Sequence, residues 1–154
     1  MKIRAITYFC DPGAMLEEKV LQQAGVFLAE AREAYELAGY EVQTTRLATV
    51  PFPRLVKKIS DTPALAQKLS AMLPQIGIAY ASLGPALPEQ MESYAVIPEA
   101  IAAGENIFFS GIMAEPRHGI SLDAVRACAE VIFRTAPLEA NGFANLNFAT
   151  LANV

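Results

Sequence analysis

The sequence predicts an α/β fold in which five mainly parallel strands are joined by helical crossovers. β-branched and aromatic residues gather in five segments, and each of the first four is followed by the three- and four-residue apolar spacing of an amphipathic helix. Alternation of this kind is typical of parallel sheets, because parallel neighbours need a long crossover connection. The predicted strands are Lys2–Cys10, Glu41–Val50, Ile76–Leu83, Asn106–Ile112 and Phe143–Ala152.

The composition indicates one apolar domain spanning residues 1–154. Of these residues 53% are hydrophobic and 18% charged, and no Gly- or Ser-rich linker divides them. Two causes account for the apolar excess. Parallel sheets are usually covered on both faces, which makes their strands apolar throughout, and a surface can also be reserved for another subunit or domain.

The first predicted helix covers Met15–Leu37. It follows the chain breaker Asp11-Pro12-Gly13, and Gly39 ends it with a residue that tolerates positive φ. The spacing predicts one buried face, made of Leu16, Val20, Ala24, Phe27, Leu28, Ala31 and Tyr35.

Prolines set the limits of the next two helices. Thr62 is the expected N-cap of the second helix, with Pro63 at its first position, and Pro74 is expected to end it. Pro98 interrupts the third helical segment, because proline lacks the N–H of a helix interior. We therefore expect a short helix over Glu89–Ala95 and another that starts at Pro98.

The last helix begins after a polar loop, residues 113–119. Ser121 is its expected N-cap. Its predicted inward residues are Leu122, Val125, Cys128, Ala129, Ile132 and Phe133.

Candidate site residues lie where the predicted strands end, because parallel sheets bind ligands beyond their carboxyl edge. His118 is the candidate acid or base, and Cys10 beside Asp11 is a candidate nucleophile next to a carboxylate. An ordinary structural role competes with each: a solvated loop for His118 and core packing for Cys10. The candidate ligand-binding residues are Ser82, Ser110, Glu115 and Arg117.

The sequence lacks the motifs of several functional classes. There is no zinc-type cluster, no GxGxxG, no P-loop and no GxSxG elbow, so we expect no metal and no cofactor. A net charge of −4 argues against a nucleic-acid partner, and no apolar run approaches the roughly 20 residues of a membrane span. The N-terminus lacks the apolar core of a signal peptide and Cys10 and Cys128 suit reduced thiols, so we expect a cytoplasmic protein.

Four short stretches resemble one family. They are Ile3-Arg4-Ala5-Ile6-Thr7, Phe52-Pro53, Ile97-Pro98-Glu99-Ala100-Ile101, and Gly119-Ile120-Ser121-Leu122-Asp123-Ala124-Val125. Together they are similar to the N-terminal portion of the uncharacterised DUF-711 (UPF-0210) family, relatives of the pyruvate formate-lyase barrel. The resemblance implies five strands that form one half of a ten-stranded barrel. The chain lacks the adjacent cysteine pair and the Arg-Val-x-Gly loop of glycyl-radical enzymes, so radical chemistry is not implied.

Two functional hypotheses follow. One is the N-terminal half-barrel of an enzyme-like protein, and the other is a non-catalytic module that binds a small ligand or drives assembly. The position of the Glu115–His118 loop separates them: over Cys10 and Asp11 it favours an enzyme, and in solvent it favours a module. We expect a homo-oligomer, or pairing with the remaining half of the same protein, because the final strand leaves a sheet edge open. A flavodoxin-like doubly wound strand order is the alternative topology.

Overall fold

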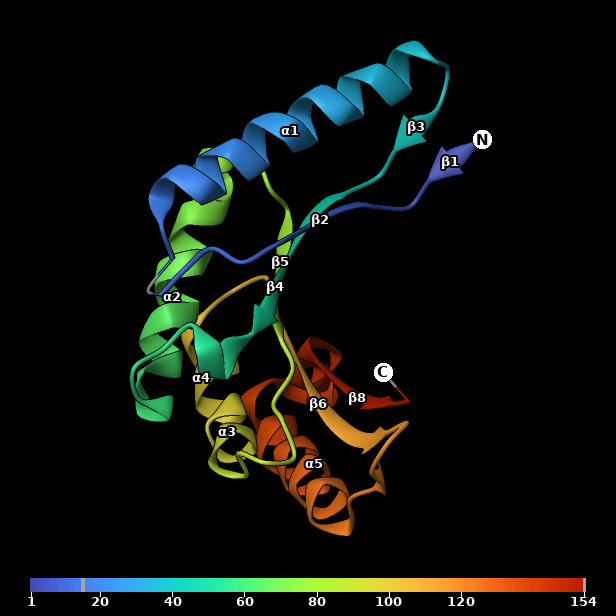
Figure 1. Ribbon diagram of the computed structural model, residues 1–154. Coiled ribbons are helices and arrows are strands. Elements are labelled where there is room, and N and C mark those ends of the chain that lie inside the picture. The colour runs from blue at the N-terminus through green and yellow to red at the C-terminus, as the bar shows by residue number, and fades with distance from the viewer. Residues whose placement is uncertain (15, 154) are drawn as a thin grey trace.

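The computed structural model describes residues 1–14 and 16–153, and its centre is a sheet of parallel strands (Figure 1). Five parallel strands lie side by side in chain order: β2 (Ile6–Cys10), β4 (Thr45–Pro51), β5 (Tyr80–Gly84), β6 (Ile107–Glu115) and β8 (Phe148–Ala152). The short β7 (Gly119–Ile120) runs antiparallel to the end of β6. The predicted mainly parallel α/β fold is confirmed, and the doubly wound alternative is wrong because the strand order never reverses.

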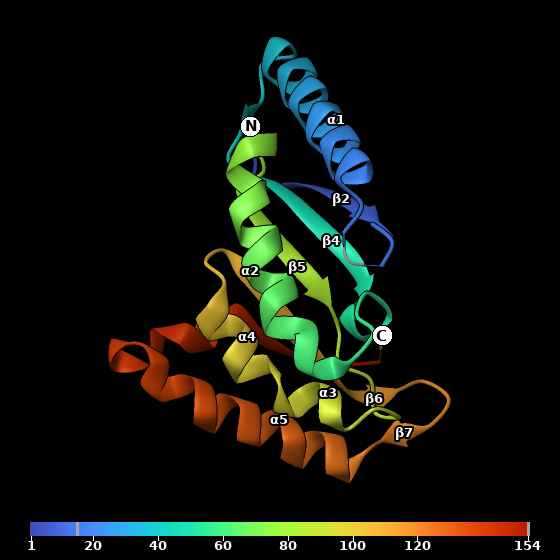
Figure 2. The same ribbon diagram turned by 90° about the vertical axis from the view of Figure 1, so that its left-hand side faces the viewer.

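The five described α-helices cover one face of this sheet. Crossovers between parallel neighbours share one hand, so strands in chain order place every crossover on the same side. Figures 1 and 2 show this layer, which contains α1 (Glu18–Leu37), α2 (Thr62–Met72), α3 (Glu92–Ala95), α4 (Ile97–Ala103) and α5 (Leu122–Thr135). Among residues 1–14 and 16–153, no such helix layer lies on the opposite face, contrary to the usual two-sided cover of parallel sheets.

The hydrophobic core lies between the sheet and these helices. Leu47 of β4, Ala81 of β5, and Leu65 and Leu69 of α2 are all buried in one hydrophobic cluster there. Phe52, which follows β4, meets Phe109 of β6 edge to face, with ring centroids 5.6 Å apart.

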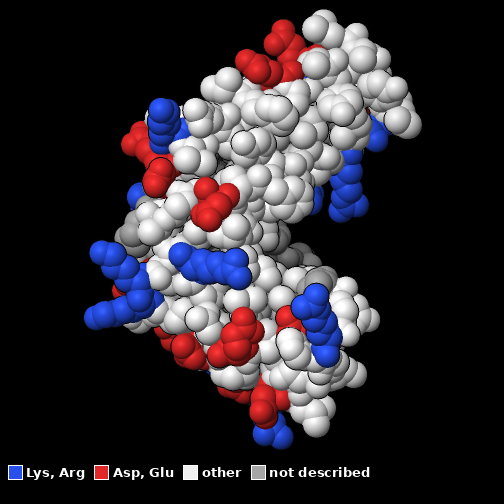
Figure 3. Space-filling view, in the orientation of Figure 1, with Lys and Arg blue, Asp and Glu red and all other residues white. Residues whose placement is uncertain are grey.

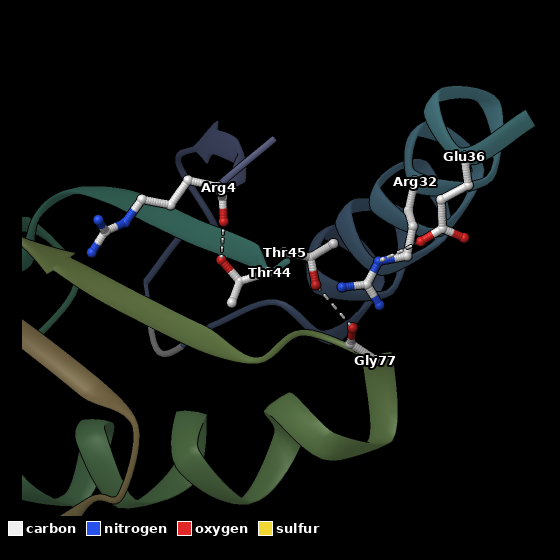
Figure 4. A network of polar contacts seen from close by, with 6 residues as sticks. All are labelled: Arg4, Arg32, Glu36, Thr44, Thr45 and Gly77. Carbon is white, nitrogen blue, oxygen red and sulfur yellow. Dashed lines mark hydrogen bonds and ion pairs between the residues drawn. The ribbon is translucent and has the colours of Figure 1, made fainter. Parts of the chain in front are cut away.

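The first two predicted strands are each broken in the middle. Lys2–Cys10 divides into β1 (Lys2–Ile3) and β2, and Glu41–Val50 divides into β3 (Glu41–Val42) and β4. The breaks lie opposite each other, where the Thr44 hydroxyl donates a 2.9 Å hydrogen bond to the Arg4 carbonyl (Figure 4). β1 and β3 pair separately as a two-stranded extension.

Two predicted strands begin too early. The chain forms a 3₁₀ turn over Leu73–Ile76, and Gly77 then reverses it with a φ of +69°, so β5 starts only at Tyr80. Near the C-terminus, Asn141 and Gly142 also have positive φ inside the 3₁₀ segment Ala140–Asn147, and β8 starts at Phe148.

The predicted polar loop over residues 113–119 is wrong in part. β6 continues through Glu115, and the chain returns as β7, with the Ser121 N–H donating to the Met113 carbonyl at 2.8 Å. The hairpin extends the sheet at the carboxyl end of β6.

Helix starts were predicted with mixed success. Ser121 caps α5 as expected, accepting from the Ala124 N–H at 3.2 Å, and the division at Pro98 is confirmed, although α3 starts only at Glu92. The Thr62 cap is wrong: Thr62 is the first helical residue, and its hydroxyl donates to the Ile59 carbonyl at 2.7 Å. The predicted end of the second helix at Pro74 is confirmed, because α2 ends at Met72, and Pro74 lies in the 3₁₀ turn Leu73–Ile76 that follows.

The predicted inward face of α5 is wrong except at Cys128. Leu122 and Phe133 are 78% and 77% exposed, while the residues packed against the sheet are Ala124, Cys128, Val131 and Thr135. The predicted buried face of α1 is wrong only in part. Ala24 and Leu28 are buried as predicted, whereas Phe27 and Tyr35 are exposed. Met15, where that helix was predicted to begin, lies outside the described residues. None of the helices within residues 1–14 and 16–153 has both the length and the hydropathy that crossing a membrane requires.

Candidate functional site

The face of the sheet that bears no helix layer carries two rows of aligned side chains. Side chains alternate between the faces of a strand, so the burial of Leu47 and Ala81 under the helices directs their neighbours to the open face. The strand register aligns Thr7, Arg46 and Tyr80 in one row. It aligns Phe9, Ala48, Ser82 and Phe108 in the next.

All of these residues except Phe9 line a groove of about 810 Å³. Figure 3 shows the hollow between the upper and lower parts of the molecule, with basic side chains at its upper rim. Leu146 and Asn147 form its wall on the side of the 3₁₀ segment, and Asn106 lies at the start of β6. The volume falls within the range of small-molecule sites, roughly 300–1,000 Å³.

Contacts with neighbouring residues hold the side chain of Arg46, which lines the groove. Its guanidinium lies over the Tyr80 ring, 5.9 Å from the ring centroid, and its Nε donates to the Thr44 hydroxyl at 3.3 Å. Tyr80 in turn meets Phe108 edge to face at 5.6 Å. The Arg46 charge is therefore oriented by an aromatic face and a hydroxyl group, and its terminal nitrogens have no protein partner among these contacts.

The groove is electropositive. Two arginines, Arg4 and Arg46, are among the residues that line it, and none of its described lining residues is Asp or Glu. The Arg4 side chain, at the break between β1 and β2, extends away from α1 (Figure 4). A cleft with charges of one sign concentrates ions of the other sign, so this geometry favours an anion.

Of the candidate residues predicted from the sequence, Ser82 lies in the groove. Ser110 is two residues beyond Phe108 on β6, largely buried, and is not among the groove-lining residues. Cys10 and Asp11 border a separate shallow hollow of about 420 Å³ at the end of β2. Asp11 accepts a hydrogen bond from the Gly13 N–H at 3.0 Å, as in an Asx turn.

Glu115, Arg117 and His118 lie at the β6–β7 hairpin. His118 contacts the Glu115 carboxylate at 3.2 Å, but its side chain is 78% exposed. The hairpin therefore presents His118 to solvent, and no described contact joins it to Cys10 or Asp11. No group of three or more His, Cys, Asp or Glu within the described residues is arranged to hold a metal ion.

Neither cysteine is activated as a nucleophile. Burial, and after it the nearby Asp11 carboxylate, raises the pKa of the Cys10 thiol above its ordinary value of 9.0. Burial raises the pKa of Cys128 to about 11. Both thiols therefore stay protonated near neutral pH, where a nucleophilic cysteine needs its thiolate.

The Cys128 thiol is expected to make the fold sensitive to alkali. Its pKa is raised in the folded state, so the folded protein holds this proton more tightly than the unfolded chain does. The associated stability, about 2 kcal/mol, is complete below pH 9 and is lost as the pH rises from 9.0 toward about 11. Urea unfolding at a series of pH values should show this loss, and Cys128→Ala should flatten the slope. Equal slopes for both proteins would contradict the assignment to Cys128.

The groove residues Arg4, Arg46, Tyr80 and Phe108 were not predicted as site residues. Their signal was present in the sequence, because Arg46 alternates with Thr45 and Leu47, which are both buried. A charged residue in the middle of a predicted central strand indicates a face without an apolar cover.

A comparison with protein families supports the resemblance noted in the sequence. The model of the family described as uncharacterised ACR (DUF711) matches residues 1–154, whereas no curated protein matches the chain. The match extends over the helices and strands described above and over every residue of the groove. The chain therefore belongs to the DUF711 family.

Proposed function

We propose that this chain is a small-ligand-binding module and that its ligand is a small anion with a planar apolar part. The observation that carries the proposal is the groove of about 810 Å³, which contains Arg4 and Arg46 without a lining carboxylate. Arg46 would bind the anionic group, because a planar guanidinium pairs with carboxylate or phosphate oxygens through two parallel hydrogen bonds.

The aromatic residues of the groove support the proposal that the ligand has a planar apolar part. Tyr80 and Phe108 stand next to each other on neighbouring strands and present ring surface beside Arg46. Aromatic rings favour the faces or edges of other planar groups. Asn106, Asn147 and Ser82 add neutral polar groups at the sides of the groove, which suit the orientation of a bound molecule.

Binding accounts for these residues better than catalysis does. The described lining contains no His, Cys, Asp or Glu, so the hydroxyl groups of Tyr80 and Ser82 have no general base beside them there that could activate them for catalysis. His118 is exposed at the hairpin, and Cys10 lies outside the groove with a raised pKa. The free thiols Cys10 and Cys128 suit a reducing compartment, so we propose that the module acts in the cytoplasm.

Ligand binding is tested by thermal shift and calorimetric titration with four probes: inorganic phosphate, benzoate, AMP and adenosine. AMP and benzoate should raise Tm more than phosphate, and adenosine, which lacks the anionic group, should have little effect. Arg46→Gln should weaken binding of the best probe at least tenfold, because a charge-assisted pair contributes about 1.5–3 kcal/mol.

Arg54→Gln is the matched control. Arg54 is an exposed arginine that follows β4 and does not line the groove, so the same change of charge there should leave the affinity unaltered. If Arg46→Gln and Arg54→Gln lost affinity equally, the loss would come from the change in net charge and not from the groove. Failure of all four probes to bind would overturn the proposed function.

A further inference from the structure

Thr44 lies at the break between β3 and β4 and lines the groove together with Arg4 and Arg46. Its hydroxyl makes two hydrogen bonds: it donates to the Arg4 carbonyl at 2.9 Å and accepts from Arg46 Nε at 3.3 Å. Chemistry fixes the direction of both bonds, because a carbonyl only accepts and a guanidinium only donates. One hydroxyl therefore links the backbone of one groove arginine to the side chain of the other.

The bond to Arg4 takes the place of a bond of the sheet ladder. The Ile6 N–H donates to the Thr44 carbonyl at 3.0 Å. The ladder of β2 and β4, continued one step toward the break, would bring the Thr44 N–H to the Arg4 carbonyl. In the structure the hydroxyl of Thr44 is the donor to that carbonyl. The break in the two strands is thus what places a hydroxyl beside Arg46.

The bond from Arg46 restricts how this arginine can bind a ligand. A guanidinium offers a pair of oxygens either its side edge, Nε with one terminal nitrogen, or its end edge, Nη1 with Nη2. Thr44 engages Nε, so the side edge cannot make two parallel bonds to a ligand. Within the part of the chain that the structure describes, no hydrogen bond or ion pair engages Nη1 or Nη2. The end edge is therefore the one left for a ligand.

We propose that Thr44 is the positioning residue of the groove. Its hydroxyl holds Arg46 so that the end edge binds the ligand, and the ligand's anion is a group with two oxygens on one central atom, as in a carboxylate. A guanidinium that is already held loses less freedom on binding, so the hydroxyl raises the affinity through Arg46. This inference rests on the proposed function, because it concerns the same groove and the same ligand.

Calorimetric titration of the whole chain with benzoate tests the role of the hydroxyl. Thr44→Val keeps the shape of the side chain and removes the hydroxyl. It should weaken benzoate binding about three- to tenfold, which is the effect of having to fix one mobile side chain. Thr44→Ser should restore binding to within about twofold of the wild type, because serine offers the same donor and acceptor.

Thr7→Val is the matched control for Thr44→Val. Thr7 lies beside Arg46 in the strand register and lines the groove, and its hydroxyl makes no described hydrogen bond. Its removal should leave the affinity for benzoate nearly unchanged. An equal loss in Thr7→Val and Thr44→Val would contradict the proposal, because the polarity of the groove would then set the affinity and not the hold on Arg46.

A double-mutant cycle separates positioning from direct contact with the ligand. Because Thr44 itself lines the groove, a loss in Thr44→Val alone does not show that the hydroxyl acts through Arg46. If it does, adding Thr44→Val to Arg46→Gln should change the affinity little, because no guanidinium is left to hold. The same loss from Thr44→Val in both backgrounds would overturn the positioning role.

NMR of the Arg46 side chain supplies a readout that needs no ligand. In the free wild type and in Thr44→Ser, the Nε–H should exchange slowly with solvent, and in Thr44→Val it should exchange rapidly. Adding benzoate to the wild type should shift the Nη signals more than the Nε signal, and the reverse would contradict binding at the end edge.

The two proposals fail in distinguishable ways. If no probe bound, the proposed function would fail, and the ligand assigned to the end edge of Arg46 would fail with it, even with a slowly exchanging Nε–H. If benzoate bound and Arg46→Gln weakened its binding, but Thr44→Val did not, the proposed function would stand and the role of Thr44 would be refuted.

Discussion

Replacing Phe109 with alanine is expected to lower the free energy of unfolding by about 3–5 kcal/mol, which is the usual range for deleting a buried aromatic side chain. Phe109 is 2% exposed and lies on the helix-covered face of β6. Its ring meets Phe52 edge to face at 5.6 Å, so the substitution removes an aromatic pair as well as apolar area. Little else can fill the space, because Phe52 is itself fully buried. Urea denaturation followed by circular dichroism measures the loss.

Phe133→Ala is the matched control for Phe109→Ala. It removes the same atoms from α5, where the side chain is 77% exposed, and should change the free energy of unfolding by less than about 0.5 kcal/mol. The pair also tests the apolar pattern of the sequence, which predicted Phe133 inside. Similar losses from the two substitutions would mean that the face of α5 is assigned wrongly.

The error on α5 has a physical cause that can be located in β6. Gly111 lies beneath the helix, and a Cβ there would come within 3.0 Å of the Cys128 sulfur and 2.8 Å of the Tyr94 ring. Such close packing requires a helix face made of small side chains, which Ala124 and Cys128 supply. The larger apolar residues, Leu122 and Phe133, have a similar helical spacing and dominate any pattern based on hydrophobicity.

The type and order of the main elements could be predicted, because periodicity and proline positions are local signals. The ends of the strands could not be predicted as well. Gly77 and Gly142 both adopt positive φ, and each comes before a strand that the apolar pattern started several residues too early. A glycine inside an apolar run does not reveal by sequence alone whether it continues the strand or reverses the chain.

The groove could not be predicted from the sequence for a different reason. The candidate residues predicted from the sequence lie at the carboxyl ends of the strands, where doubly wound sheets bind their ligands. Which face of the sheet is bare depends on strand order, and strand order is a property of long-range pairing. Once β2, β4, β5 and β6 are known to follow chain order, all crossovers fall on one face and Arg46 is left on the other.

The second large effect is expected at Gly84, the last residue of β5. β4 and β5 change register between Ala48 and Pro51, and there the two backbones approach closely. A Cβ on Gly84 would lie 2.5 Å from the Val50 carbonyl oxygen and 2.6 Å from that of Thr49. These atoms belong to a backbone that the sheet holds on both sides, so they cannot move away as a flexible side chain would. Gly84→Ala is therefore expected to cost about 3 kcal/mol, at the upper end of the usual range for overpacking.

Two further variants separate this steric overlap from other effects of removing a glycine. Gly77→Ala changes a glycine that has a positive φ but no atom within 4 Å of the added Cβ, so it should cost only the conformational strain, about 1–2 kcal/mol. Thr49→Ser keeps the hydroxyl that accepts from the Gly84 N–H at 3.1 Å and should be nearly neutral. Chemical denaturation of the three variants should rank Gly84→Ala as the least stable. If Gly84→Ala were no worse than Gly77→Ala, the strands would be free to separate at Gly84, and the close approach of β4 and β5 would not constrain the sheet.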